Sequence, residues 1–285
     1  KYNLMILIAD SGSTKTDWRL VNNNSNQIYS IETIGFNPYF IDANGILDEL
    51  SKSALSKNNT EVKQVFFYGA GCSSSEKSSI VQTALQLFFN NAQIDVEHDL
   101  LAAARAVSGN TSGLVAILGT GANTCLYDGK NITTNIPALG YLLGDEGSGA
   151  HLGMGFIKKY LHHEFSEKIN EEFSQAYPNL NLNKILDAVY KQALPNRFLA
   201  QFSRFVHAHA EDDKIKALII ACMNEFFEKY ICKYPNYSAY KLNLVGSVAF
   251  YYQNFIREIA LIHQIEIDTI IKQPIDALVK YHCNA

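Results

Sequence analysis

The chain has 285 residues, of which 47% are hydrophobic and 18% are charged, and its formal net charge is −4. This length and composition allow a large buried core and two lobes. The 24 lysines and arginines are spread along the chain and form no basic stripe, which argues against nucleic acid as a partner. No apolar run approaches the roughly 20 residues of a membrane span, so we expect no membrane partner.

The five cysteines are scattered along the chain and show no CxxC spacing. An odd number at irregular spacing is typical of a reduced protein without a structural zinc site. The first residues also lack the pattern of a signal peptide. We therefore expect a cytoplasmic protein.

The first 110 residues predict an alternation of strands and helices. The alternation of residue types in KTDWRLV (15–21) places Thr16, Trp18 and Leu20 on one face of the second strand. Strand followed by helix, repeated along the chain, indicates an α/β fold. Strands are expected at 4–10, 15–21, 27–33, 62–71 and 92–98, and helices at 47–55, 73–91 and 99–107.

The opening pattern recurs at 114–132, where a buried strand again runs into a Gly/Thr turn and a second strand. We align Gly12 with Gly121 and interpret the pattern as an internal repeat, one copy at the head of each half. The boundary is expected near residue 110, which gives an N-terminal lobe 1–110 and a C-terminal lobe 111–285. After residue 148 the sequence is mostly helical, with further strands expected at 241–247 and 264–271.

The turn after the first strand, DSGSTKT (10–16), has the composition of a phosphate-binding loop. Glycine lets backbone N–H groups approach an anion, and the neighbouring hydroxyls and lysine add donors and charge. Asp10 is an oxygen ligand suited to Mg²⁺ or its waters. A P-loop is excluded because GxxxxGK[ST] is absent and a strand follows, so a plain β-hairpin is the alternative. The residues expected to contact phosphate are Gly12, Ser13, Thr14, Lys15 and Thr16.

The second turn, GTGANT (119–124), carries the same composition. It is not a Rossmann fingerprint, because a third glycine is absent and a strand follows instead of a helix. Its alternative is again a plain hairpin. Two such turns at the heads of two halves favour phosphate binding, here by Gly119, Thr120 and Gly121.

The stretch PALGYLLGDEGSGAHLGMGF (137–156) places the acid pair Asp145-Glu146 among six glycines. Ser148 is expected to cap the helix that follows, and the first N–H groups of that helix would face a bound ligand. A flexible hinge is the alternative.

Two further positions have a functional and an ordinary interpretation. Asp99 follows a predicted strand at the edge where α/β sites form, so it is a candidate general base, but it could equally be the N-cap of the next helix. Gly246-Ser247 joins a strand to a helix, where a glycine would let a flat ring approach the backbone. An ordinary strand–helix turn is the alternative there.

In this order, DSGSTKT, LGTGAN, GDEGSG and VGSV resemble the actin/hexokinase/Hsp70 phosphotransferase superfamily. More closely, nearly the whole chain resembles the BadF/BadG/BcrA/BcrD ATPase family and its N-acetylglucosamine kinase-like branch. The resemblance implies a two-lobed actin-like ATPase (ribonuclease H-like) fold. It also implies an ATP-dependent kinase with Mg²⁺ that phosphorylates the 6-hydroxyl of an N-acetylated amino sugar bound in the same cleft, and a possible homodimer.

The resemblance also implies a role for individual residues. Asp10 would place Mg²⁺, both turns would contact the phosphates of ATP, and Gly246 and Ser247 would lie at the adenosine. Asp99 would accept the proton of the sugar hydroxyl. The residues expected at the sugar are Asn37, Asn123, Gly140, Tyr141 and Asp145.

Relatives of the N-acetylglucosamine kinase type usually carry Gly-Gly-Trp-Gly before GDEGS, whereas this chain has Ala138-Leu139-Gly140, with Tyr141 following. The exact sugar therefore stays open, and a kinase for N-acetylmuramic acid is an alternative. A partner-coupled ATPase of the BadF type and a non-catalytic sugar sensor are further alternatives. The cysteine pair that would hold an iron–sulfur cluster in dehydratase activators has no match here.

Overall fold

A computed structural model of the chain describes residues 5–12, 14–22 and 27–283. The chain forms two compact units. The first comprises Lys1–Asn110, Gly129–Asn131 and Gln273–Ala285, and the second comprises Thr111–Asp128 and Ile132–Lys272. Among the residues described, no helix is long and apolar enough to cross a membrane.

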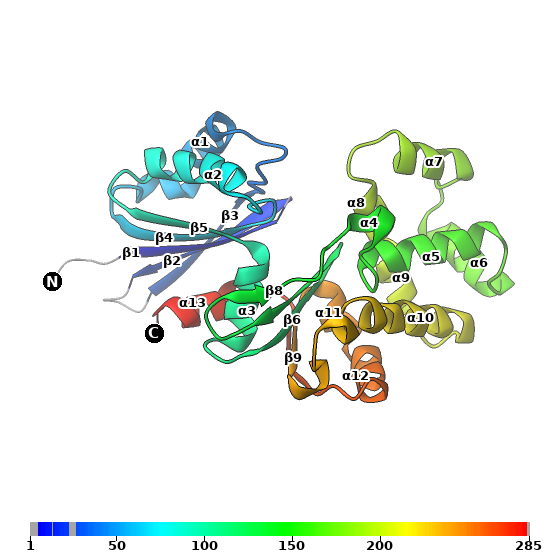
Figure 1. Cartoon of the computed structure of the whole chain (residues 1–285). Coiled ribbons are helices and arrows are strands. Elements are labelled where there is room, and N and C mark those ends of the chain that lie inside the picture. The colour runs from blue at the N-terminus through cyan, green and yellow to red at the C-terminus, as the bar shows by residue number, and fades with distance from the viewer. Residues whose placement is uncertain (1–4, 13, 23–26, 284–285) are drawn as a thin grey trace. The chain divides into compact units, whose positions relative to one another are not determined.

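The first unit is built on a five-stranded mixed sheet in the order β3-β2-β1-β4-β5 (Figure 1). Strands β1, β2 and β3 are antiparallel neighbours, whereas β4 and β5 run parallel to β1. In β2 the expected inward face of Thr16, Trp18 and Leu20 is confirmed, because all three are buried. The strands are β1 (Met5–Ser11), β2 (Lys15–Asn22), β3 (Gln27–Ile34), β4 (Val62–Gly69) and β5 (Gln93–His98).

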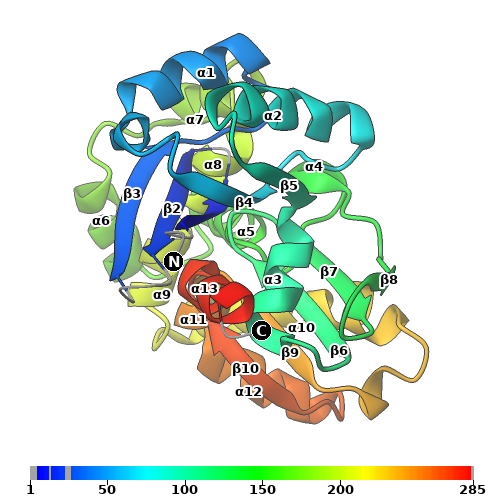
Figure 2. The same cartoon turned by 90° about the vertical axis from the view of Figure 1, so that its left-hand side faces the viewer.

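Helices cover both faces of this sheet. One face packs against α1 (Ala43–Lys52) and α2 (Ser75–Phe88) and buries Trp18. The other packs against α3 (Asp99–Ser108) and α13 (Ile275–Cys283), which lie side by side (Figure 2). The two predicted helices before β5 are therefore present, although the first ends at Lys52 and a 3₁₀ turn, Ala54–Lys57, follows it.

The second unit repeats this sheet order in its own strands, β8-β7-β6-β9-β10. Strands β6, β7 and β8 are antiparallel neighbours, whereas β9 and β10 run parallel to β6. The predicted internal repeat is therefore confirmed, with a tight turn joining the first two strands in each copy. The strands are β6 (Gly113–Leu118), β7 (Ala122–Tyr127), β8 (Ile132–Thr134), β9 (Leu242–Val245) and β10 (Ile267–Ile271).

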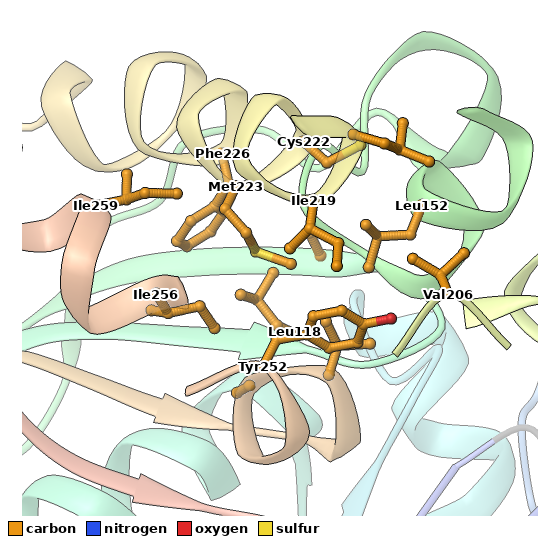
Figure 3. Close-up of a cluster of buried hydrophobic side chains, with 14 of the residues drawn as sticks. Leu118, Leu152, Val206, Ile219, Cys222, Met223, Phe226, Tyr252, Ile256 and Ile259 are labelled. Carbon is orange, nitrogen blue, oxygen red and sulfur yellow. The ribbon is translucent and has the colours of Figure 1, made fainter. Parts of the chain in front are cut away.

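The second unit is also rich in helices, as expected for the chain after residue 148. In its core, Leu118 of β6 packs with side chains from several helices, including Leu152, Met223 and Ile256 (Figure 3). Gly153 permits close packing of two helices, since a Cβ there would stand 1.9 Å from the carbonyl oxygen of Leu199. The helices are α4 (Gly140–Leu143), α5 (Gly149–Leu161), α6 (Glu167–Ala176), α7 (Leu182–Tyr190), α8 (Pro195–Ala200), α9 (Ser203–Ala208), α10 (Asp213–Lys229), α11 (Ser247–Tyr251) and α12 (Gln253–Ile262).

The last helix, α13, is held to the first sheet by His282. Its imidazole stacks on Phe66 with ring centroids 3.7 Å apart, and its Nε2 lies 2.7 Å from the hydroxyl of Tyr68. The guanidinium of Arg105 donates to the same hydroxyl at 2.7 Å. Burial, and secondarily the charge of Arg105, lowers the pKa of His282 from 6.5 to about 4.

This lowered pKa predicts a loss of stability in mild acid. The unfolded chain binds the proton of His282 below pH 6.5 and the folded chain does not, so the free energy of unfolding falls as the pH drops from about 6.5 towards 4. Between pH 7.5 and pH 5.0 we expect the free energy of unfolding of His282→Gln to fall by about 1–2 kcal/mol less than that of the parent chain. Denaturant titrations at the two pH values measure this difference. The control is His162→Gln, which changes a histidine at an exposed position. An equal fall in the free energy of unfolding in all three proteins would contradict the lowered pKa of His282.

Candidate functional site

In the first unit, the predicted site residues gather at one edge of the sheet. Strands β1, β4 and β5 are parallel, and Ser11 pairs with Gly69, which pairs with His98. The carboxyl ends of the three strands therefore share an edge, which is where α/β proteins place their ligands. Asp10 at the end of β1 and Asp99 just after β5 both lie there.

The first turn is a hairpin closed by the N–H of Gly12, which donates to the carbonyl of Lys15 at 2.9 Å. The hydroxyl of Ser11 lies 2.8 Å from that of Thr16 and accepts from the N–H of Phe36 at 3.0 Å. The hydroxyl of Thr16 donates to the carbonyl of Ile34 at 2.9 Å. Buried hydroxyls thus tie the turn to the segment that follows β3.

These contacts determine which hydrogen-bond donors of the turn can contact a phosphate. The hydroxyl of Thr16 is buried and engaged inside the unit, so its contact with phosphate stays a prediction. The ammonium of Lys15 pairs with Asp17 at 2.9 Å and with Glu32 at 3.2 Å. Gly12 and Thr14 are described and exposed, whereas Ser13 lies outside the described residues.

Asp10 sits in an environment that disfavours its charge. Burial raises its pKa to about 7, and the charges of Asp99 and Asp17 act in the same direction, while Lys15 opposes them. A carboxylate crowded by other carboxylates is stabilised by a cation. This environment fits the predicted role of Asp10 in placing Mg²⁺.

The described residues contain no group of three or more His, Cys, Asp or Glu side chains that could hold a metal ion. Mg²⁺ commonly binds through one or two carboxylates together with phosphate oxygens and waters, and does not need such a cage. Asp10, with Asp99 near enough to raise its pKa, offers the one or two carboxylates that such a site needs.

Asp99 is the first residue of α3, and the N-cap is His98, which corrects the alternative that placed Asp99 at the cap. The Nδ1 of His98 accepts from the N–H of Leu101 at 3.3 Å, so the helix begins one residue earlier than that alternative requires. Burial raises the pKa of Asp99, while the charge of His98 and the N–H of Leu100 lower it. The N-cap is therefore His98, and the raised pKa makes the Asp99 carboxylate a stronger base than an exposed one.

Asn37 is held rigidly beside the same edge. Its neighbour Phe36 is buried against Trp18, with ring centroids 6.0 Å apart. The side-chain oxygen of Asn37 accepts from the N–H of Tyr39 at 3.0 Å. Gly71, at a φ of +84°, leaves the space that Asn37 fills, since a Cβ there would stand 2.4 Å from that oxygen.

In the second unit, the turn Gly119–Gly121 joins β6 to β7 and is supported by the start of α5. The N–H of Gly149 donates to the carbonyl of Gly119 at 2.8 Å, and the N–H of Ala150 donates to that of Thr120 at 3.1 Å. Ser148 caps α5 as expected, by accepting from His151 at 3.2 Å. The first N–H groups of α5 therefore bind the turn and not a ligand, which corrects the expectation for them, while the positive end of the helix dipole lies beside the turn.

Asp145 of GDEGSG reaches the same turn. Its carboxylate is buried and accepts from the N–H of Ala122 at 3.1 Å, and its own N–H bonds to the hydroxyl of Tyr230 at 3.0 Å. Gly121 leaves room for it, because a Cβ there would stand 2.9 Å from the carboxylate. The structure therefore makes Asp145 a support of the phosphate turn, and its contact with sugar stays a prediction.

Gly246 places the end of β9 against the end of β6. Its φ is +127°, and a Cβ there would stand 2.2 Å from the carbonyl oxygen of Leu118 and 3.3 Å from the nitrogen of Gly119. No residue with a Cβ fits this position without moving the Gly119–Gly121 turn. The two predicted nucleotide motifs, LGTG and VGSV, are therefore in backbone contact.

A pocket of about 840 Å³ opens at this point of the second unit. Its wall includes Gly119 and Thr120 of the turn, together with Ser247 and Lys272 from the carboxyl ends of β9 and β10. The volume lies within the range of small-molecule sites, and the place is the edge that the parallel strands predict. Sequence reasoning missed further lining residues, Tyr177, Arg197, Arg204, His207, Tyr251 and Lys272.

The other residues expected at the sugar lie apart from this pocket. The side-chain oxygen of Asn123 accepts from the N–H of Thr124 and from the amide of Asn135, both at 3.0 Å. Gly140, with a φ of +73°, and Tyr141 begin the short helix α4. Three leucines around them are strongly exposed, and they are Leu139 (58%), Leu142 (75%) and Leu143 (72%).

Comparison with solved structures identifies several similar chains. A protein from Porphyromonas gingivalis, named as a candidate N-acetylglucosamine kinase, is 37% identical over 98% of this chain and 99% of its own, with a TM-score of 0.93. A protein from Chromobacterium violaceum with the same description is 14% identical over 100% of both chains, with a TM-score of 0.73. No protein-family model and no curated protein sequence matched the chain.

A ROK family glucokinase from Streptomyces griseus, solved in complex with glucose and AMPPNP, is 13% identical over 98% of both chains, with a TM-score of 0.56. At this identity the likeness concerns the fold alone. The fold is the α/β fold of actin-like ATPases, as expected, with its duplicated strand–turn–strand units.

Proposed function

We propose that this chain, which belongs to the family of the Porphyromonas gingivalis protein, is an ATP-dependent carbohydrate kinase of the actin/hexokinase/Hsp70 superfamily. It would phosphorylate the 6-hydroxyl of an N-acetylated amino sugar. The observation that carries this proposal is the shared sheet edge in the first unit. There a phosphate-type turn stands beside Asp99, a carboxylate whose pKa is raised by burial. N-Acetylglucosamine is the acceptor we propose, after the name of the relative.

The donor is ATP, bound in the pocket of the second unit. The turn Gly119–Gly121 would direct backbone N–H groups at the phosphates, and the positive end of α5 behind it would favour their charge. Gly246 and Ser247 would lie at the adenosine, since Ser247 lines the same pocket. The first turn would contact the phosphates through Gly12, Ser13 and Thr14.

Asp99 would act as the general base of the transfer. Its carboxylate would accept the proton of the sugar 6-hydroxyl while that oxygen attacks the γ-phosphorus and ADP leaves. When bound, Mg²⁺ supplies positive charge against the phosphate oxygens. Asp10 would hold the ion or its waters, which relieves the repulsion between Asp10 and Asp99.

The acceptor would be positioned by Asn37, with Asn123, Gly140, Tyr141 and Asp145 as the further proposed contacts. Asn37 is the best supported of these, because its side chain is already fixed by Tyr39 and Gly71. A preorganised contact positions the reacting hydroxyl without an entropic cost at the moment of reaction. We further propose membership of the BadF/BadG/BcrA/BcrD family, a cytoplasmic location and a homodimer.

The test is the structure of the product. The chain is incubated with MgATP and N-acetylglucosamine, and the product is assigned by ³¹P and ¹³C NMR. We expect a 6-phosphate and no product from the 6-deoxy sugar. A phosphate at another hydroxyl, or turnover of the 6-deoxy sugar, would contradict the proposal.

N-Acetylmuramic acid is a second candidate acceptor, favoured by the exposed Leu139, Leu142 and Leu143 beside Gly140–Tyr141. The methyl group of the lactyl ether that this sugar carries would contact this apolar surface, while the lactyl carboxylate would face water. The NMR experiment is repeated with N-acetylmuramic acid, and kcat/KM is measured for both acceptors from initial rates. A higher kcat/KM for N-acetylmuramic acid would make it the substrate.

Gly71→Ala should weaken sugar binding selectively. The added Cβ would displace the side chain of Asn37, while the donor pocket in the second unit stays unchanged. We expect the KM for sugar to rise roughly tenfold or more, as one polar contact is misplaced, and the KM for ATP to change less than about twofold. Gly109→Ala is the control, since a Cβ there meets nothing within 4 Å at a positive φ of +56°. Equal changes in both KM values would contradict a role for Asn37 at the sugar.

A further inference from the structure

The pocket of the second unit carries more positive charge than a nucleoside requires. Arg197 of α8, Arg204 of α9 and Lys272, which follows β10, all line it. None of the described residues of its lining is an aspartate or a glutamate. This local excess occurs in a chain whose formal net charge is −4.

The three cations, which we call the cationic wall, have no carboxylate partner among the described residues. Lys272 donates to the hydroxyl of Tyr251 at 2.7 Å and lies 4.9 Å from the centre of its ring. Arg197 and Arg204 make no side-chain hydrogen bond or ion pair within the described part of the chain. By contrast, lysines elsewhere in this unit do pair with carboxylates, as Lys159 does with Glu164 and Lys241 with Glu266.

Four polar side chains of the pocket are already engaged by backbone carbonyls of their own unit. Gln201 donates to Phe198 at 2.8 Å, and Ser203 donates to Ala200 at 2.7 Å. His207 lies 2.9 Å from the carbonyl of Tyr251, and Tyr252 donates to that of Ser203 at 2.6 Å. The charged groups that remain to recognise a ligand are the three cations, which favours additional negative charge.

Lys272, at one end of the wall, lies apart from the Gly119–Gly121 turn, whereas α8 and α9 pack closer to that turn through Gly149. The sheet order β10-β9-β6 puts the end of β10, and thus Lys272, two strands away from Gly119. Adjacent strands lie about 4.8 Å apart, so these two backbone positions are about 10 Å apart. A ligand whose 5′-phosphates lie at the turn would bring its ribose or base towards the wall.

We propose that the pocket binds phosphate at two places, the Gly119–Gly121 turn and the cationic wall, and therefore binds nucleotides with an additional phosphate on the ribose more tightly than nucleotides without one. The inference rests on the proposed function only in placing 5′-phosphates at the turn. Such nucleotides would compete with ATP and inhibit the kinase. Charge-assisted hydrogen bonds from guanidinium to phosphate supply the selectivity.

The test is direct binding by isothermal titration calorimetry to the full chain, without sugar or turnover. AMP is compared with adenosine 3′,5′-bisphosphate and adenosine 2′,5′-bisphosphate, each of which adds a single phosphate. We expect at least one bisphosphate to bind tenfold or more tightly than AMP, with an advantage that shrinks as salt is raised. Equal affinities of AMP and both bisphosphates would overturn the proposal.

Variants locate the second phosphate. Arg204→Ala combined with Lys272→Ala should bring the bisphosphate to the affinity that the same variant has for AMP, so that the bisphosphate loses about tenfold more affinity than AMP does. Arg204→Lys should retain part of the advantage, and Lys241→Ala, a paired lysine outside the pocket, should retain all of it. If the double variant lost equal affinity for AMP and for the bisphosphate, the wall would bind the 5′-phosphate, which would contradict the proposal.

The same experiment separates this inference from the proposed function. Preferential bisphosphate binding that an ATP analogue displaces supports the inference even where no sugar is phosphorylated. Sugar phosphorylation without that preference supports the kinase and overturns the inference.

Discussion

Asp99→Asn is expected to lower kcat roughly 100-fold or more, because the amide cannot accept the proton of the attacking hydroxyl. The pocket proposed for the nucleotide lies in the second unit, so the Kd for ATP should change less than about twofold. Burial raises the pKa of Asp99 and its charge opposes that of Asp10, so removing the charge should not lower the melting temperature. Steady-state kinetics, nucleotide titration and thermal unfolding measure the three quantities.

Asp95→Asn is the matched control, since it makes the same chemical change within β5 and away from the carboxyl edge. Its kcat should stay within about twofold of the parent. An Asp99→Asn protein that retains near-full turnover would remove Asp99 from the role of base. A parallel loss of stability and of nucleotide binding would instead make Asp99 a structural residue.

Gly246→Ala should disrupt both the fold of the second unit and donor binding. The new Cβ would collide with the carbonyl oxygen of Leu118, and alanine would be strained at a φ of +127°. Strain and overpacking together should lower the free energy of unfolding by about 2–5 kcal/mol. Relief of the collision moves the phosphate turn, so we expect the Kd for ATP to rise at least tenfold in the protein that remains folded.

Gly119→Ala separates the two effects. A Cβ at Gly119 meets nothing within 4 Å, so stability should be kept within about 1 kcal/mol. ATP binding should still weaken, because the methyl group would stand where phosphate approaches the backbone. If Gly246→Ala binds ATP as tightly as the parent chain, the contact between the two motifs is not needed for the donor site.

Much of the fold could be predicted from the sequence because local pattern determines it. Alternation in KTDWRLV predicted a strand with Trp18 inward, and the same pattern excluded a P-loop. The repeat of a strand–turn–strand unit predicted two similar sheets, and their strand orders agree. The capping role of Ser148 also followed from residue type alone.

Other features depend on tertiary contacts that residue type does not reveal. The start of α3 is decided by the imidazole of His98, a less common cap than the neighbouring aspartate. Residue type does not indicate that Asp145 supports the turn at Gly121, since the contact joins loops 24 residues apart. Arg197 and Arg204 enter the pocket through the packing of α8 and α9, whereas Lys272 could have been found from its place after a parallel strand.

The central claim is tested most directly by ADP release from MgATP with a panel of sugars and a sugar-free blank. The panel contains N-acetylglucosamine, N-acetylmuramic acid, glucosamine and glucose. We predict that ADP release depends on sugar and is fastest with an acetamido sugar, N-acetylglucosamine before the others. ADP release at the same rate in the blank and with every sugar would contradict the kinase and indicate a partner-coupled ATPase.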